Sequence, residues 1–444
     1  MSTDNLNYSI EAVAATEGAQ SARDRNRILV AGTIGTTIEW YDFFIYGLIA
    51  PLVFDRLFFP KFDQLTATMA VFATFAVGFL ARPLGGLVFG HFGDRIGRKS
   101  VLLCTLLIMG LATMAIGLLP TYESVGILAT AALLILRFLQ GFALGGESTA
   151  AGLMAIETAP GDKRGLSAAI IQAAGPLGVV LASLAAMAMA TLPEEALLSW
   201  GWRIPFIVSG ILVAIGLYMR LRVEESATFR QTVRQSSHTP TVPALEAIRS
   251  HPRPILAILF AEMAQTSYFY LTAIFTLSFA TRQLGVPKDV VTQAVLYANI
   301  VALIAMPIIG AWSDRIGRKR LFLAGLILAA VSIMFFYDLL ATRDSAMVMG
   351  AVIVAAGLLH PLMFSTEGSY FPELFPTRVR FSGVSIGKQL GTVLGGGLAP
   401  LIATALYAAT GTTLSIVCYY LVMAAAAVIA LRFVRETKDE PLSN

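Results

Sequence analysis

Ionisable side chains lie inside long apolar stretches of this chain, where charge is costly and usually serves a function. Glu39 and Asp42 are three residues apart in one apolar segment, so a helix would place both carboxylates on one face. Arg82, Arg137 and Glu147 lie in two later apolar segments. A buried carboxylate can bind and release a proton, whereas a guanidinium stays charged and binds carboxylates through two parallel hydrogen bonds. These residue types predict proton coupling and recognition of an acidic small molecule.

Three carboxylates are candidates for carrying the proton: Asp42, Glu39 and Glu147. Asp42 and Arg137 lie at comparable depth in their segments, so we expect them to neutralise each other. The cation holds the carboxylate of such a pair ionised. A conformational change that separates the pair would therefore lead to uptake or release of a proton. A static ion pair that only fixes helix packing is the alternative. Glu39 lies one turn from Asp42, and the sequence does not rank the two.

Arg137 and Arg82 are the candidates for binding a substrate carboxylate, because their charge persists at any relevant pH. Arg82 precedes Pro83, so a structural role at a helix break is an equal alternative. The sequence leaves open whether three further polar residues in apolar segments are functional or structural: His360, Glu367 and Lys388.

The elements that would position these residues are membrane helices. The chain of 444 residues is 56% hydrophobic and 14% charged, and its mean hydropathy is +0.73, whereas soluble domains carry about 25% charged residues. One helical crossing needs roughly 20 apolar residues. An all-α polytopic membrane protein with twelve transmembrane helices is therefore predicted from these segments: 28–54, 66–91, 101–120, 124–156, 166–192, 203–221, 254–280, 290–312, 321–341, 345–371, 381–409 and 412–434.

Basic residues gather in alternate connections, which by the positive-inside rule places both termini in the cytoplasm. One long polar connection separates six segments from six, and a short amphipathic helix within it is the alternative to a plain linker. The predicted organisation has five parts: a cytoplasmic arm (1–27), a six-helix half (28–221), a cytoplasmic linker (222–253), a second six-helix half (254–434) and a cytoplasmic tail (435–444).

The two halves contain an internal duplication. FGHFGDRIGRKS from Phe89 and IGAWSDRIGRKR from Ile309 follow the second helix of each half, and ETAPGDKRGLS from Glu157 matches PELFPTRVRFSG from Pro372. Parallel repeats of this kind place a substrate site between the halves. The duplicated loops predict a cytoplasmic gate, with a loop that only sets topology as the alternative. The gate residues are Gly90, Asp94, Arg95, Gly97, Arg98, Lys99, Asp314, Arg315 and Arg318.

The loop pattern Gly-x-x-x-Asp-Arg-x-Gly-Arg-Lys resembles the signature of the major facilitator superfamily. Within it, IEWYDFFIYG from Ile38, RFLQGFALGGE from Arg137 and SWGWRIPF from Ser199 resemble the metabolite–proton symporters, which include shikimate, 2-oxoglutarate, citrate and proline/betaine carriers. The resemblance implies the major facilitator fold, proton coupling and a polar metabolite. It also implies that some amides and aromatics line the cavity, and the candidates are Gln140, Gln265 and Tyr268.

No nucleotide-binding motif, zinc-protease motif or cysteine pair is present, so we expect no enzyme activity, no cofactor and no metal. The expected partners are a small-molecule substrate, a proton and membrane lipid, with no nucleic acid, and we expect a monomer in a bacterial inner membrane. The main hypothesis is proton-coupled import of a small carboxylate-bearing metabolite, such as an organic acid or a betaine. A proton-coupled drug exporter or a uniporter of the same fold is the alternative.

Overall fold

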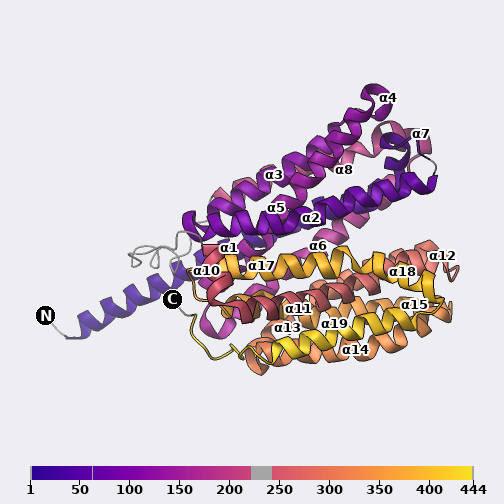
Figure 1. Ribbon diagram of the computed structural model, residues 1–444. Coiled ribbons are helices and arrows are strands. Elements are labelled where there is room, and N and C mark those ends of the chain that lie inside the picture. Colours follow the sequence, from indigo (N-terminus) through magenta and orange to yellow (C-terminus); the bar gives the residue numbers. More distant parts are fainter. Residues whose placement is uncertain (1–2, 63, 222–242, 443–444) are drawn as a thin grey trace.

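The computed structural model describes residues 3–62, 64–221 and 243–442, which are helical almost throughout (Figure 1). The first half contains α1 (Thr3–Phe58), α2 (Gln64–Ile96), α3 (Arg98–Leu118), α4 (Tyr122–Val125), α5 (Ile127–Thr158), η1 (Gly161–Lys163), α6 (Arg164–Ala190), α7 (Glu194–Ala196), η2 (Leu197–Gly201) and α8 (Arg203–Leu221). The second half contains α10 (Pro243–Ser250), α11 (Pro252–Phe269), η3 (Tyr270–Phe275), α12 (Thr276–Arg282), α13 (Lys288–Ile316), α14 (Arg318–Ala341), α15 (Ser345–Val352), η4 (Ile353–Leu359), α16 (His360–Glu373), α17 (Arg380–Thr392), η5 (Val393–Gly397), α18 (Ala399–Thr410) and α19 (Leu414–Leu431).

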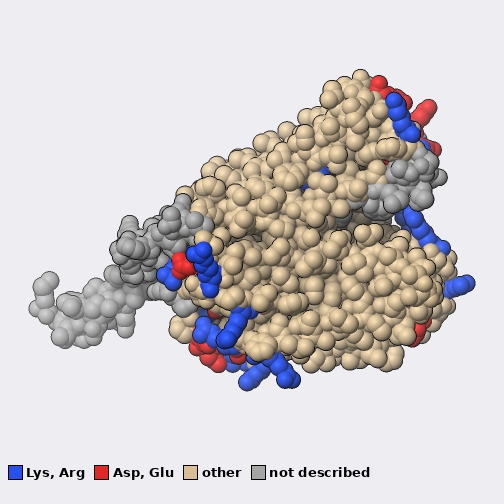
Figure 2. All heavy atoms as spheres, in the orientation of Figure 1, with Lys and Arg blue, Asp and Glu red and all other residues tan. Residues whose placement is uncertain are grey.

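The prediction of an all-helical membrane protein is confirmed. Within the described residues, nine helical stretches are long and apolar enough to cross a membrane. Three further rods, α1, α2 and the continuous α11–η3–α12, pack against such stretches. This arrangement is consistent with the twelve predicted spans. The side of the molecule seen in Figure 2 agrees, because charged atoms gather at its two ends and a broad uncharged belt lies between them.

The two ends of the bundle differ in how the halves meet. At one end, here called the tail end, α2 and α13 finish and the C-terminal residues lie against the bundle (Figure 1). There α6 of the first half packs along α13 of the second, and α2 packs along α17. The halves spread apart toward the opposite end, which carries α4, α7 and α12 (Figure 1). The structure is therefore closed between the halves at the tail end.

Close backbone approach, and not side-chain interdigitation, joins α2 to α5 and α11 to α17. A Cβ atom on Gly141 would collide with the carbonyl oxygen of Gly78, and one on Gly145 would collide with that of Arg82. In the second half the glycines at 387, 391 and 395 lie against backbone carbonyl oxygens of α11 in the same way. Membrane helices pack through small residues because lipid offers no hydrophobic drive for their association. The glycines therefore fix how the cavity walls stand relative to each other.

The structure differs from the sequence-based expectation at two connections. The segment 1–27, expected as an arm, belongs to α1 from Thr3 onward and projects beyond the bundle (Figure 1); its alanine and glutamate content favours a helix. Within the expected linker 222–253, residues 222–242 lie outside the described part of the chain, and α10 occupies Pro243–Ser250. This short helix buries Ala244 and Ala247 and exposes Leu245, and the amphipathic helix stays an alternative for the linker.

Substitution of Gly141 by alanine tests the backbone contact between α2 and α5. We expect Gly141→Ala to lower the thermal stability of the purified protein, because the added methyl group meets a carbonyl oxygen that no rotamer can move aside; overpacking of this kind costs about 1–3 kcal/mol. The matched control is Gly350→Ala, since a Cβ atom at Gly350 meets nothing within 4 Å. Equal melting temperatures for the two variants would contradict the packing argument.

Candidate functional site

A cavity lies between the two halves. Helices α1, α2, α5 and α6 form its wall in the first half, and α11, η3, α16 and α17 form its wall in the second. The lining residues are Glu39, Trp40, Phe43, Phe44, Arg82, Leu144, Gln172, Glu262, Gln265, Thr266, Phe269, Tyr270, His360, Phe364, Lys388, Gln389 and Thr392. Acidic and basic groups therefore share one cavity with aromatic rings.

Arg82 is the cation of the first-half wall. Its guanidinium carbon lies 4.5 Å from the ring centre of Phe43 and 4.3 Å from that of Phe79. It is within electrostatic reach of Glu39 and Glu262, which line the same cavity. Its Nε has no hydrogen-bond partner among the described residues. Contact with two aromatic rings partly replaces the hydration that the guanidinium loses on burial.

Lys388 is the cation of the second-half wall. Its Nζ donates to Oε1 of Glu367 at 2.8 Å, and the same oxygen accepts a hydrogen bond from Nε2 of Gln172 at 3.1 Å. Gln172 belongs to α6 of the first half, so this contact joins the two halves. Oε1 of Glu262 accepts from Thr392 at 2.7 Å and from Thr266. The wall is therefore a hydrogen-bonded network of charged and polar groups.

Gln265 connects the cavity to a buried histidine. Its Nε2 lies 2.7 Å from Nε2 of His360, and its Oε1 lies 2.8 Å from the Thr266 hydroxyl, whose single proton is shared between Gln265 and Glu262. Because the amide nitrogen donates, the histidine nitrogen is the acceptor in this contact. The His360 ring is stacked on Phe364, with ring centres 5.3 Å apart. His360 thus has both a polar partner and an aromatic neighbour inside the cavity wall.

Four predicted site residues lie behind this lining or outside it. Arg137 is buried on α5, where its guanidinium carbon lies 3.8 Å from the ring centre of Tyr46 and its Nη1 donates to Gln140 at 2.7 Å. Gln140 in turn donates to Thr113 at 2.6 Å. Asp42 is buried on α1. The hydroxyl of Tyr268 lies 2.6 Å from that of Ser332 on α14, away from the cavity lining. The roles assigned to these residues remain predictions.

Glu147 lies on α5, but its side chain is outside the described part of the structure. Among the predicted residues, the structure brings Glu39, Arg82 and Gln265 together on the cavity lining. The most prominent lining residues outside the predicted site are Glu262 and Lys388. Both were visible in the sequence as charges in apolar segments, whereas uncharged lining residues such as Gln172 and Thr392 carried no such signal.

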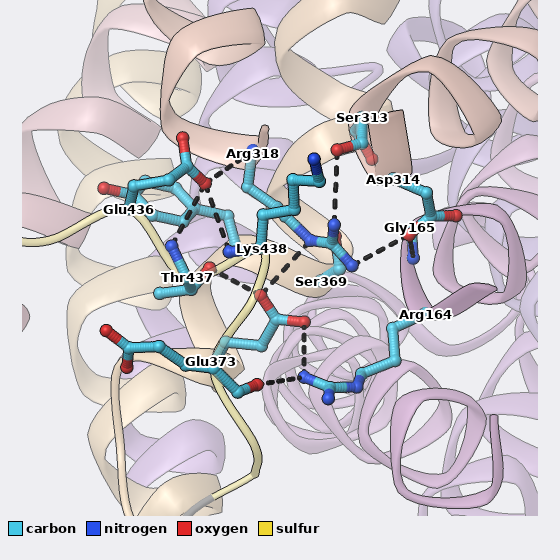
Figure 3. Close-up of polar contacts among 12 residues, drawn as sticks. Arg164, Gly165, Ser313, Asp314, Arg318, Ser369, Glu373, Glu436, Thr437 and Lys438 are labelled. Atoms are coloured by element: carbon cyan, nitrogen blue, oxygen red, sulfur yellow. Dashed lines mark hydrogen bonds and ion pairs between the residues drawn. The ribbon is translucent and has the colours of Figure 1, made fainter. Parts of the chain in front are cut away.

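The duplicated loop motif of the second half makes a contact between the halves at the tail end (Figure 3). Asp314, at the end of α13, accepts hydrogen bonds from the backbone N–H groups of Gly165 at 2.8 Å and Leu166 at 2.9 Å, which begin α6 of the first half. The unpaired N–H groups and positive dipole end of a helix N-terminus favour a carboxylate. Nη2 of Arg318 donates to the same carboxylate at 2.8 Å.

Two buried ion pairs between the halves flank this contact. Nη1 of Arg380 lies 3.3 Å from Oε1 of Glu157, and Nη1 of Arg164 lies 3.2 Å from Oε1 of Glu373. Glu157 corresponds to Glu373 in the internal duplication, and Arg164 corresponds to Arg380. Each half therefore provides the acid of one pair and the base of the other. Arg318 adds an ion-pair contact to Glu373 at 3.3 Å.

The C-terminal segment covers this cluster (Figure 3). The carboxylate of Glu436 accepts hydrogen bonds from the backbone N–H groups that begin α14, including that of Arg318 at 2.8 Å. The Thr437 hydroxyl donates to Glu373, and Arg164 donates to the carbonyl oxygen of Glu440 at 3.0 Å. Residues of both halves and of the C-terminal segment are thus held in one polar cluster.

The loop motif of the first half is described only in part. The side chains of Asp94, Arg95 and Arg98 lie outside the described residues. Gly97 and its counterpart Gly317 both adopt left-handed backbone angles, with φ of 99° and 117°, which favour glycine at this turn. Three further predicted gate residues are described. Gly90 lies close to α17, since a Cβ atom on it would be 3.2 Å from the Ser382 backbone. Lys99 donates to the Leu221 carbonyl oxygen at 3.2 Å, and Arg315 is exposed.

Comparison with known proteins agrees with this architecture. The family model described as Major Facilitator Superfamily matches residues 32–281 and 263–444. A shikimate transporter of Escherichia coli K12 is 36% identical over 392 residues, which are 88% of this chain and 90% of that protein. An inner membrane metabolite transport protein of the same strain, YhjE, is 37% identical over 427 residues, with 94% and 96% covered. The proline/betaine transporter of that strain is 31% identical over 425 residues, with 94% and 84% covered.

The solved structure of the proton:xylose symporter XylE matches with a TM-score of 0.77 over 95% of this chain and 98% of that chain. At 17% sequence identity, this likeness concerns the fold alone. The family model and the curated relatives span nearly the whole chain, and those relatives are transporters. The expectation of a multi-pass membrane transporter that is not an enzyme is confirmed, and the chain belongs to the major facilitator superfamily.

Proposed function

We propose that this transporter imports a small carboxylate-bearing metabolite, an organic acid or a betaine, together with protons across a bacterial inner membrane. The observation that carries the proposal is the cavity between the halves, which presents Arg82 on one wall and Lys388 on the other. An anionic or zwitterionic ligand fits this space because its carboxylate can compensate a cation that protein groups only partly satisfy.

Arg82 is proposed to bind the substrate carboxylate. Its Nε has no hydrogen-bond partner in the described structure, its guanidinium lies against the rings of Phe43 and Phe79, and Arg82 lines the cavity. Lys388 is already engaged by Glu367, so it is less free to bind a ligand in this conformation. A drug exporter would favour a wide apolar cavity with acidic groups alone, whereas this cavity has cations on two opposite walls.

The names of the relatives support a polar cargo of this kind. Shikimate, proline and betaine, which those names state for those proteins, all carry a carboxylate. The chain is about one third identical to each of these relatives across most of its length. Because the relatives differ in what they carry, the proposal for this chain stays at the chemical class. A second carboxylate, an aliphatic ring or a quaternary amine would each be distinguished by the shape of the cavity.

Asp42 and Glu39 are proposed as proton carriers of the first half, with Glu147 as a further candidate. Asp42 and Glu39 are buried on α1, and Glu39 lines the cavity. Burial disfavours the charged carboxylate unless a cation compensates it, so movement of a nearby arginine can drive proton exchange. Arg82 is such a cation for Glu39, and Arg137 is the proposed one for Asp42. A co-transported proton also offsets anionic charge that the inside-negative potential repels.

The ion-pair cluster at the tail end is proposed as the cytoplasmic gate, which places both termini in the cytoplasm. In this conformation it holds the halves together through Glu157–Arg380, Arg164–Glu373 and the contact of Asp314 with α6. Opening toward the cytoplasm requires that all of these contacts separate together. The gate would therefore set the rate of the conformational step, while the cavity sets which solute is bound.

Uptake into right-side-out membrane vesicles tests the driving force. With shikimate and glycine betaine as radiolabelled probes, we expect uptake of at least one to rise when the outside is more acidic and to collapse with a protonophore, without a requirement for ATP. Vesicles from cells that lack the protein provide the background. Uptake that survives the protonophore, or export of lipophilic cations in place of uptake, would refute import by proton symport.

Replacement of Arg82 tests carboxylate recognition. We expect Arg82→Gln to weaken binding of the transported carboxylate by about 10- to 100-fold, because a hydrogen bond to a charged group contributes about 1.5–3 kcal/mol and 1.4 kcal/mol corresponds to a factor of ten. The measurement is isothermal titration or thermal shift with the solute identified by uptake. Lys61→Gln is the control, since Lys61 is exposed and far from the cavity lining. Unchanged affinity in Arg82→Gln would make Arg82 structural.

A charge exchange tests the gate. We expect Arg380→Glu to impair transport strongly, because it places two carboxylates together where removal of one partner from a buried pair already costs about 3–5 kcal/mol. Transport should recover in part in the double variant Glu157→Arg with Arg380→Glu, because the hydrogen bonds from Arg380 Nε to the carbonyl oxygens of Pro372 and Phe375 stay lost, while substrate binding changes little in either. Glu194→Gln, which breaks an exposed ion pair with Arg56 inside the first half, should have no effect. No recovery in the double variant would count against pairing between the halves.

A further inference from the structure

A pair of buried carboxyl groups lies in the second half where α11, α16 and α17 meet. Glu262 of α11 is 3% exposed and Glu367 of α16 is 1% exposed. The two carboxyl groups lie within hydrogen-bonding reach of each other, and Lys388 of α17 contacts Glu367. Two carboxylates this close repel each other strongly in a low-dielectric interior, so such pairs normally retain a proton.

The hydrogen bonds of this pair are divided unevenly between its oxygens. Oε1 of Glu262 accepts from Thr392 and Thr266, and Oε1 of Glu367 accepts from Lys388 and Gln172. The Oε2 atom of each carboxyl group is buried and has no hydrogen-bond partner among the described residues. An ionised carboxylate oxygen left in this state is strongly destabilising, as an unpaired buried charge is. A proton on one carboxyl group would donate to the other and would remove this cost.

The balance of charges around the pair favours one bound proton. Glu262 and Glu367 together would carry two negative charges against the single ammonium of Lys388. Arg82 of α2 and Glu39 of α1 also reach the cluster, but their charges are opposite and offset each other. The other titratable groups that face this region are His360 of α16, which is held by Gln265, and Tyr270 of η3, which faces Arg82.

We propose that Glu262 and Glu367 bind one proton between them, with Lys388 as the counter-charge, as a second proton site in the half opposite to Asp42. The proton forms a covalent O–H bond to one carboxyl group and a hydrogen bond to the other. A metal ion fits this site poorly, because the ammonium of Lys388 lies 2.8 Å from one of the carboxyl oxygens that would have to bind it. The inference deepens the proposed function, since it assigns part of the proton coupling to the second half.

The site is built to respond to the motion of the halves. Glu262 lines the cavity, so a proton can reach the pair from the solvent side. Gln172, which donates to Glu367 at 3.1 Å and to the Phe364 carbonyl at 3.2 Å, comes from the first half. When the halves rock apart at this level, Glu367 loses that donor, so the environment of the pair differs between the two conformations.

Infrared difference spectroscopy of the purified protein tests the shared proton without any substrate. A pH step should reveal the carbonyl stretching band of a protonated carboxylic acid. We expect Glu262→Gln and Glu367→Gln each to remove the whole contribution of the pair, because the one remaining carboxylate is then balanced by Lys388 and stays ionised. Lys388→Met should increase that contribution about twofold, since both carboxyl groups then need a proton. All variants are first checked for folding by gel filtration.

Glu195→Gln is the matched control, because Glu195 is an exposed glutamate at the far end of the bundle. The proposal is refuted if either glutamine variant retains part of the band and only the double variant abolishes it, since the groups would then titrate independently. It is also refuted if sodium at constant pH changes the spectrum while a pH step does not. Because no solute or gradient is used, a failure of proton-driven uptake would leave this result intact, and the two proposals fail separately.

Discussion

Charge buried between two helical halves in a membrane has no water to stabilise it, so every such group must find compensation inside the protein. At the tail end, arginines and glutamates of opposite halves compensate each other in ion pairs. At the cavity and just behind its wall compensation is incomplete among the described residues, because Arg82 Nε and the Oε2 atoms of Glu262 and Glu367 have no hydrogen-bond partner there. A solute or a proton can supply the missing compensation in the cavity. The ion pairs at the tail end instead hold the two halves together in one closed conformation.

Much of this arrangement could be predicted from the sequence. Hydropathy gives the helical segments, and the repeat of the DRIGRK motif gives two related halves, because both signals are local in the chain. The glycines at 141 and 145 could be assigned to close helix packing, since residues without side chains in membrane helices usually allow backbones to approach. The charges in apolar segments drew attention to Glu39 and Arg82, which line the cavity, because an intramembrane charge stands out whatever the fold.

The rest of the site depends on which helix faces which, and that is settled by packing over the whole chain. Glu367 and Lys388 stand out in the sequence as charges in apolar segments, but nothing in the sequence places Glu262, more than a hundred residues earlier, beside Glu367. Gln172 is uncharged and had no signal, although it connects the halves at the carboxyl pair. Similarly, α1 continues to Thr3 because alanine-rich polar sequence favours a helix without being apolar, so hydropathy alone ends the element too early.

The exchanged ion pairs bear on the history of the chain. Glu157 with Arg380 and Glu373 with Arg164 are the same contact made twice, as in a homodimer whose surface patch pairs with its own copy across a twofold axis. Duplication of one six-helix ancestor that formed such a dimer would supply both pairs at once, with no new interface to invent. Once fused, the two copies no longer mutate together. A change at any of the four positions therefore has its compensating position in the other half, more than two hundred residues away, and related sequences should record paired substitutions at that separation.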